Sequence, residues 1–135
     1  MITSEQYFQA KPHEPEHSAA AFTLLEKVNE LIEWARLGGF AGDVDPDTGT
    51  QISGSKGGAG DGGFRLTSAK TGAVGSKHKS AHAVDVYDPD DVLDRILSDD
   101  DLARFGLYRE APDSTPGWAH LQDVASGSGK RTFHP

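Results

Sequence analysis

The sequence predicts a small α+β protein in which an N-terminal helix packs on a small antiparallel sheet. One long amphipathic pattern starts at His17, and two short segments with strand character lie in the second half. The 135 residues suffice for one domain. We divide it into a helical part, a glycine-rich loop region, a core that holds the candidate site, and a tail: residues 1–39, 40–63, 64–123 and 124–135.

Two helices are expected in the N-terminal part. A capping-box pattern at residues 3–6 predicts a short helix that ends near Gln9, and the two prolines in 11–16 predict a turn. From His17, apolar residues recur at helical spacing until Gly38 supplies a stop. The stripe, which we expect to cover one face of a sheet, consists of Ala21, Leu24, Leu25, Val28, Leu31, Ile32 and Ala35.

The expected strands lie in the core region. Residues 83–87 alternate and contain β-branched side chains, and 118–122 is expected to be the last strand. Residues 51–53 and 64–66 are weaker strand candidates. Two short capped helices are expected between the two main strands. Asp88 before Pro89 predicts the start of the first helix. Ser98 before three aspartates predicts the start of the second, which we expect to end near Gly106.

Composition excludes several classes of protein. The net charge is −8, so a nucleic-acid partner is not expected, because phosphate binding needs a cationic face. The absence of cysteine excludes disulfides, thiolate metal sites and a cysteine nucleophile. No run approaches the roughly 18 apolar residues that span a bilayer, and no secretion signal is visible, so we expect neither a membrane partner nor a signal peptide.

The glycine-rich stretch 58–63 satisfies the G-x-G-x-x-G pattern of dinucleotide-binding loops. That loop needs a strand before it and a helix that opens at it, and here a strand candidate follows instead. We therefore interpret the stretch as a loop, with a nucleotide-binding domain as a remote alternative.

Three residues are of types that bind a metal ion: His78, Asp85 and His120. Zinc without thiolates favours imidazole nitrogens and a carboxylate, and a catalytic site keeps a fourth position open for water. Asp85 and His120 fall in the two best strand candidates, so adjacent strands can present both on one sheet face. The alternative is that these are ordinary hydrogen-bonded polar residues, because such spacing also arises by chance.

Residues 76–85 resemble the S-x-H-x-x-G-x-A-x-D signature of zinc D-Ala-D-Ala peptidases, and 118–120 resembles their W-x-H element. This family has the hedgehog/DD-peptidase fold and includes carboxypeptidases, resistance dipeptidases and phage endolysins. The resemblance covers residues 52–123 and implies a Zn²⁺ site with His78, Asp85 and His120 as ligands.

The resemblance also implies roles for neighbouring residues. Arg65 lies where many members have an arginine that contacts the substrate, and its alternative is a solvated strand residue. Ser76 would fix the turn or orient a ligand. His82 and Trp118 are candidates for the same supporting or substrate-binding roles.

Two positions depart from the family pattern. Ala81 stands where glycine is usual, so we expect its backbone to avoid positive φ. Gly117 occupies the place, three residues before the last histidine, where many members carry an acidic general base. We rank Asp113 first as the replacement base, with Glu110 and His82 as alternatives.

These features lead us to expect a zinc-dependent peptidase that acts on the stem peptide of bacterial peptidoglycan, as an endolysin or a DD-carboxypeptidase does. A cationic rim would suit the carboxylates of that peptide: Lys56, Arg65, Lys70, Lys77 and Lys79, against Asp61. The alternative is a non-catalytic zinc-binding structural or virion-associated protein. We expect a monomer. By the same resemblance we expect a phage-encoded protein that is made in the host cytoplasm and acts on the wall after release, or is virion-associated.

Overall fold

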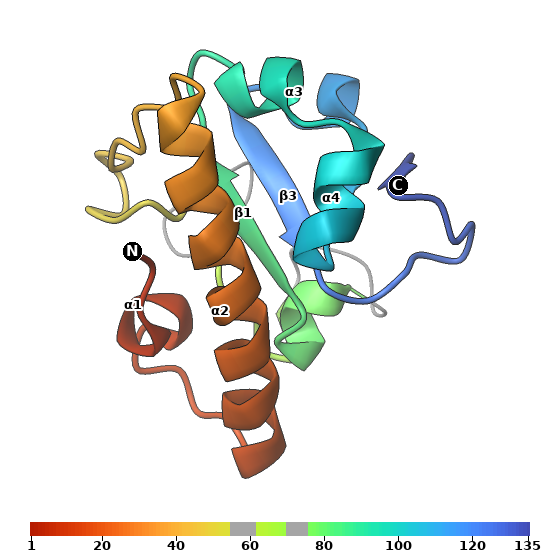
Figure 1. The fold of residues 1–135 in the computed structure, drawn as a ribbon. Coiled ribbons are helices and arrows are strands. Elements are labelled where there is room, and N and C mark those ends of the chain that lie inside the picture. Colours follow the sequence, from red (N-terminus) through yellow and green to blue (C-terminus); the bar gives the residue numbers. More distant parts are fainter. Residues whose placement is uncertain (55–61, 70–75) are drawn as a thin grey trace.

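The computed structural model describes residues 1–54, 62–69 and 76–135 (Figure 1). It confirms a small α+β protein with one four-stranded sheet and an N-terminal helix. The helices are α1 (Ser4–Phe8), α2 (Pro15–Leu37), α3 (Val92–Ile96) and α4 (Asp99–Phe105), with short 3-10 helices η1 (Lys77–Ser80) and η2 (Pro112–Ser114). The strands are β1 (Ala83–Tyr87), β2 (Tyr108–Glu110), β3 (Trp118–Gln122) and β4 (Thr132–Phe133).

The sheet has the strand order β1-β3-β2-β4. β3 pairs antiparallel with both β1 and β2, whereas β4 runs parallel to β2 at the edge. The expectation of a purely antiparallel sheet that ends with 118–122 was therefore wrong. Both β2 and β4 escaped prediction because strands of three and two residues are too short to show alternation.

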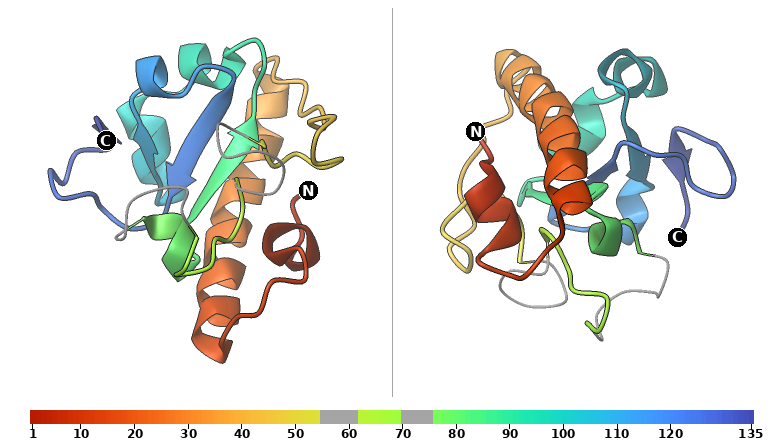
Figure 2. Two further views of the ribbon diagram at one scale, coloured as in Figure 1. Left: turned by 180° about the vertical axis from the view of Figure 1, so that it is seen from behind. Right: turned by 90° about the horizontal axis from the view of Figure 1, so that it is seen from below.

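The long helix α2 covers one face of this sheet. It crosses in front of β1 in Figure 1, and the view from behind in Figure 2 shows the face that it leaves open. All seven apolar residues of the predicted stripe are buried, and they share one core with Val84, Val86 and Leu121 of the sheet. α2 begins at Pro15, inside the segment predicted as a turn, because proline suits the first turn of a helix.

Helix α1 ties the N-terminus to the segment before the candidate site. Its Thr3 capping box forms as predicted. The Tyr7 hydroxyl donates to the Ala83 carbonyl oxygen at 2.8 Å, and the Tyr7 carbonyl accepts from the Phe64 N–H at 3.0 Å. The Arg65 N–H donates to the His78 carbonyl at 3.1 Å. Residues 64–66 thus bond to a helix and a turn, and the strand predicted there is not formed.

Other local predictions had mixed outcomes. Residues 51–53 contribute only an isolated bridge, from Ile52 to Val86. The Asp88 carboxylate caps α3 by accepting from two backbone N–H groups, but the helix starts later than the Asp88-Pro89 pattern predicts. The Ser98 capping box and the end of α4 at Gly106 are confirmed. Most of the 58–63 glycine stretch lies outside the described residues.

Within residues 1–54, 62–69 and 76–135, every helix is too short or too polar to cross a bilayer.

The acidic start of α3 should make folding stability depend on pH. Partial burial, and then the carboxylates of Asp91 and Asp88, raise the pKa of Asp94 to about 6. The folded protein therefore holds this proton more tightly than the unfolded chain, whose aspartate pKa is about 3.9, and stability falls as pH rises between the two values. Asp94→Asn should stabilise the protein at pH 7 by less than about 1 kcal/mol, since solvent screens this half-exposed group. The substitution should have little effect at pH 4, because the folded protein already holds the proton there.

Urea unfolding at both pH values measures this difference. Asp43→Asn changes the same charge on an exposed aspartate and serves as the control. An equal gain from Asp94→Asn at pH 4 and pH 7 would contradict the assignment.

Candidate metal centre

His78 is positioned by the short helix η1. Ser76 caps this helix, because its Oγ accepts from the His78 N–H at 3.3 Å. The imidazole is buried, with 2% exposure, and its Nδ1 lies 2.9 Å from the Gly63 carbonyl oxygen. A carbonyl can only accept, so Nδ1 carries a proton, and in the neutral imidazole Nε2 then turns a lone pair toward the sheet.

The turn after η1 uses a strained residue. Ala81 has φ 64° and ψ 32°, so the expectation that its backbone avoids positive φ was wrong. The left-handed conformation costs a non-glycine residue about 1 kcal/mol. The Ala81 methyl group is fully buried in the core, and this burial offsets part of the strain.

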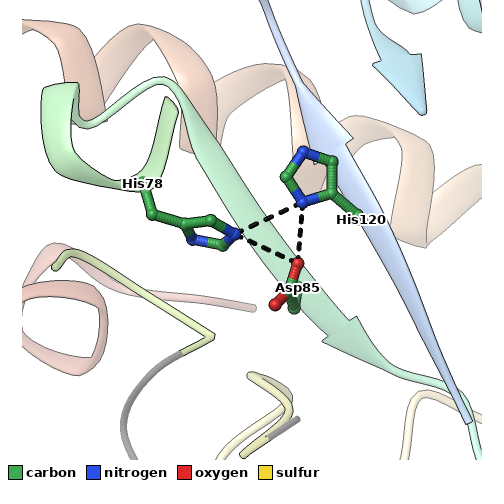
Figure 3. Close-up of side chains that lie close together, drawn as sticks. All are labelled: His78, Asp85 and His120. Atoms are coloured by element: carbon green, nitrogen blue, oxygen red, sulfur yellow. Dashed lines mark hydrogen bonds and ion pairs between the residues drawn. The ribbon is translucent and has the colours of Figure 1, made fainter. Parts of the chain in front are cut away.

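The pairing of β1 with β3 sets Asp85 directly opposite His120. The Asp85 Oδ1 lies 3.0 Å from His120 Nδ1 and 3.3 Å from His78 Nε2, and these two nitrogens are 3.3 Å apart. Figure 3 shows the three side chains converging in front of the strands, with α2 behind them. All three are buried, and they lie close enough together to bind one metal ion.

The three side chains lie close enough to change the pKa values of Asp85 and His120. Burial by itself raises the pKa of Asp85, but the facing imidazoles of His78 and His120 more than offset this and hold it below its usual range. Burial lowers the pKa of His120, but the hydrogen bond and negative charge of Asp85 outweigh it and raise that pKa. The cluster therefore attracts positive charge, which a proton or a metal ion can supply.

Arg65 also reaches the site. Its Nη2 lies 3.6 Å from Asp85 Oδ2, the carboxylate oxygen that does not face the histidines, and its side chain is almost fully buried. The guanidinium thus engages the outer oxygen of Asp85 while Oδ1 faces His78 and His120. The sequence-based alternative of a solvated arginine is not what the structure shows.

The structure brings Glu110, and not Asp113, next to the candidate ligands. Glu110 lies on β2, beside β3, and its Oε1 is 3.9 Å from His120 Nδ1 with the side chain 23% exposed. Asp113 lies exposed in η2 and makes no ion pair with any residue in the described part of the chain. The sequence analysis ranked Asp113 first, and without a predicted β2 it did not place Glu110 on a strand beside His120.

The other predicted site residues lie around the cluster. His82 Nδ1 is 2.8 Å from Asp123 Oδ1, so its ring pairs with Asp123. Trp118 is half-buried at the far end of β3, opposite Tyr87. In the expected cationic rim, Lys79 is buried and donates to the Ala69 carbonyl at 2.9 Å, and Lys56 and Lys70 lie outside the described residues.

Sequence reasoning missed Gln122, whose Oε1 is 2.7 Å from His120 Nε2. Its place two residues after His120 on a predicted strand was the available signal, because alternate side chains of a strand share a face.

Comparison with known proteins adds no relative. No protein-family model, no curated protein and no solved structure matches this chain. The fold and the candidate site are therefore interpreted from their own geometry and chemistry. The resemblance of residues 76–85 and 118–120 to zinc peptidases remains a prediction from the sequence.

Replacement of any candidate ligand should abolish metal binding. We expect the wild-type protein to retain about one equivalent of a divalent ion after dialysis, and each of His78→Ala, Asp85→Ala and His120→Ala to retain almost none, because two ligands hold an ion poorly. Elemental analysis by mass spectrometry measures the ion.

Metal should also raise the melting temperature of the wild-type protein alone, because the ion binds the folded form. His134→Ala, at an exposed position near the C-terminus, is the control and should behave as wild type. One retained equivalent in all three ligand variants would exclude this ligand set.

Proposed function

We propose that this protein is a zinc-dependent peptidase that cleaves a peptide bond in the stem peptide of bacterial peptidoglycan. The observation that carries the proposal is the buried triangle of donor atoms from His78, Asp85 and His120, with edges of 3.0–3.3 Å. Donors bound to a tetrahedral zinc ion at 2.0–2.1 Å are about 3.3–3.4 Å apart. The triangle therefore suits zinc with little rearrangement.

The identity of the donors supports a catalytic ion. Two imidazoles and one carboxylate are a three-ligand set typical of zinc hydrolases, and a structural site would use a fourth protein ligand. No fourth His, Cys, Asp or Glu joins the cluster among the described residues. When bound, zinc supplies a Lewis acid that polarises a carbonyl and lowers the pKa of a coordinated water to about 7.

The surrounding residues can supply the remaining chemistry. Glu110 lies beside His120 and is partly exposed, so its carboxylate can accept a proton from an attacking water and return it to the leaving amine. Arg65 orients Asp85 through the outer carboxylate oxygen. A contact between Arg65 and the substrate stays part of the proposal, supported by its position at the site.

The substrate class is supported by the resemblance of 76–85 and 118–120 to zinc D-Ala-D-Ala peptidases. The same resemblance supports the hedgehog/DD-peptidase fold and a phage-encoded enzyme that acts after release. Support from a cationic rim is weaker than expected, because Lys79 is buried and Arg65 is engaged with Asp85.

A second candidate function is a zinc-binding structural or virion-associated protein without catalysis. Gly117 favours it, because many family members carry the general base at this position. Gly117 has φ +90°, a conformation that strains any other residue, so an acid is not readily accommodated there. The distinction depends on whether Glu110 replaces that acid.

Glu110→Gln should lower kcat about 10²–10⁴-fold, the usual contribution of a general base, without loss of bound zinc. Asp113→Asn is the matched control, because it neutralises an exposed acid in the same segment, and it should leave kcat unchanged. Mass spectrometry of fragments released from purified peptidoglycan, with and without a chelator, measures the rate and the bond that is cut.

Loss of activity in Asp113→Asn alone would return the base to Asp113. If the zinc-loaded wild-type protein releases no stem fragment, the non-catalytic alternative is correct.

A further inference from the structure

Gln122 connects His120 to the backbone through two consecutive hydrogen bonds. Gln122 Nε2 lies 2.8 Å from the Val124 carbonyl oxygen, and Gln122 Oε1 lies 2.7 Å from His120 Nε2. The Gln122 side chain is buried, with 3% exposure of the residue. Both ends of the amide are therefore committed, one to Val124 and one to His120.

The direction of these bonds follows from the chemistry of each group. The Val124 carbonyl can only accept, so the amide nitrogen of Gln122 must donate to it. The amide oxygen then faces His120 and can only accept, so His120 Nε2 must carry the proton. In the neutral imidazole that a metal ion binds, this is the only ring proton, so Nδ1 keeps a lone pair directed at Asp85 and His78.

We infer that Gln122 is a positioning residue that holds His120 in the Nε2–H tautomer and so keeps Nδ1 available to a metal ion. The inference rests on the metal site of the proposed function and not on its peptidase activity. In the other tautomer, the proton of His120 would point into the donor triangle and block the ion. A backbone carbonyl plays the equivalent part for His78, whose Nδ1–H donates to Gly63.

The position of Gln122 on β3 lets its side chain reach both of its partners. Gln122 follows His120 by two residues on β3, so both side chains lie on the same face of the sheet. Its partner on the neighbouring strand β1 is Ala83, which has a small side chain. From there the side chain reaches both the imidazole and the carbonyl of Val124, just beyond the strand end.

Both partners of the histidines are neutral acceptors. A carboxylate in either place would raise the basicity of the imidazole and weaken the ion as a Lewis acid. With Gly63 and Gln122 as partners, Asp85 is the one carboxylate in the three-residue ligand set, and its outer oxygen already faces Arg65. This arrangement favours an electrophilic metal ion.

Three substitutions distinguish the effect of the acceptor oxygen on zinc affinity from the effect of the size of the side chain. Gln122→Met keeps the length and removes the acceptor, and we expect zinc affinity to fall about 10–100-fold, the usual effect of losing such a partner. Gln122→Glu keeps an acceptor oxygen and should retain zinc to within a few-fold. Gln51→Met is the matched control, because it makes the same change at a buried glutamine whose Nε2 donates to the Gly42 carbonyl at 3.0 Å. Its zinc affinity should equal that of wild type.

Zinc affinity is measured by competition with a chromophoric chelator. The tautomer is read directly from long-range ¹H–¹⁵N NMR spectra of the histidine rings in the metal-free wild-type protein at alkaline pH, where each ring carries a single proton and no ion dictates its place. We expect a proton on Nε2 of His120 and on Nδ1 of His78. This measurement decides the inference even if Gln122→Met does not fold.

Unchanged zinc affinity in Gln122→Met, or a proton on Nδ1 of His120 in the metal-free protein, would overturn the inference. Failure to hydrolyse peptidoglycan, with the expected affinities and tautomers, would overturn the proposed peptidase and leave the role of Gln122 established.

Discussion

The antiparallel pairing of β1 with β3 is the constraint on which the candidate site depends. Because side chains alternate along a strand, a slip of one residue would turn Asp85 to the opposite face. The apolar face prevents that slip, because Val84, Val86 and Leu121 must remain in the core shared with α2. The burial of apolar side chains under α2 thereby also places Asp85 opposite His120 on the other face.

The polar face is stabilised by partners that come from distant parts of the chain. A buried carboxylate is costly unless it is paired, and Asp85 is surrounded by His78, His120 and Arg65. Backbone bonds from Phe64 to Tyr7 and from Arg65 to His78 connect these partners to α1. The N-terminal helix is therefore linked to the candidate metal centre, although none of its residues is a candidate ligand.

The two departures from the peptidase pattern both occur at positive φ. Ala81 takes the left-handed conformation despite its side chain, and Gly117 takes a conformation that suits glycine. The backbone at Gly117 is also held by its N–H, which donates to Asp91 Oδ1 at 2.9 Å. The carboxylate next to His120 comes instead from Glu110 on the adjacent strand β2. In this protein the acidic group and the last histidine thus lie on different strands.

Local signals in the sequence determined the apolar stripe of α2, the capping boxes at Thr3 and Ser98, the two main strands and the candidate ligands. Each depends on residues close together in the chain, or on donor types that a metal requires. The parallel edge strand, Glu110 beside His120 and the bonds of Gln122 were decided only by the tertiary structure. They depend on which strands become neighbours, and segments of two or three residues carry too little periodicity to specify a neighbour.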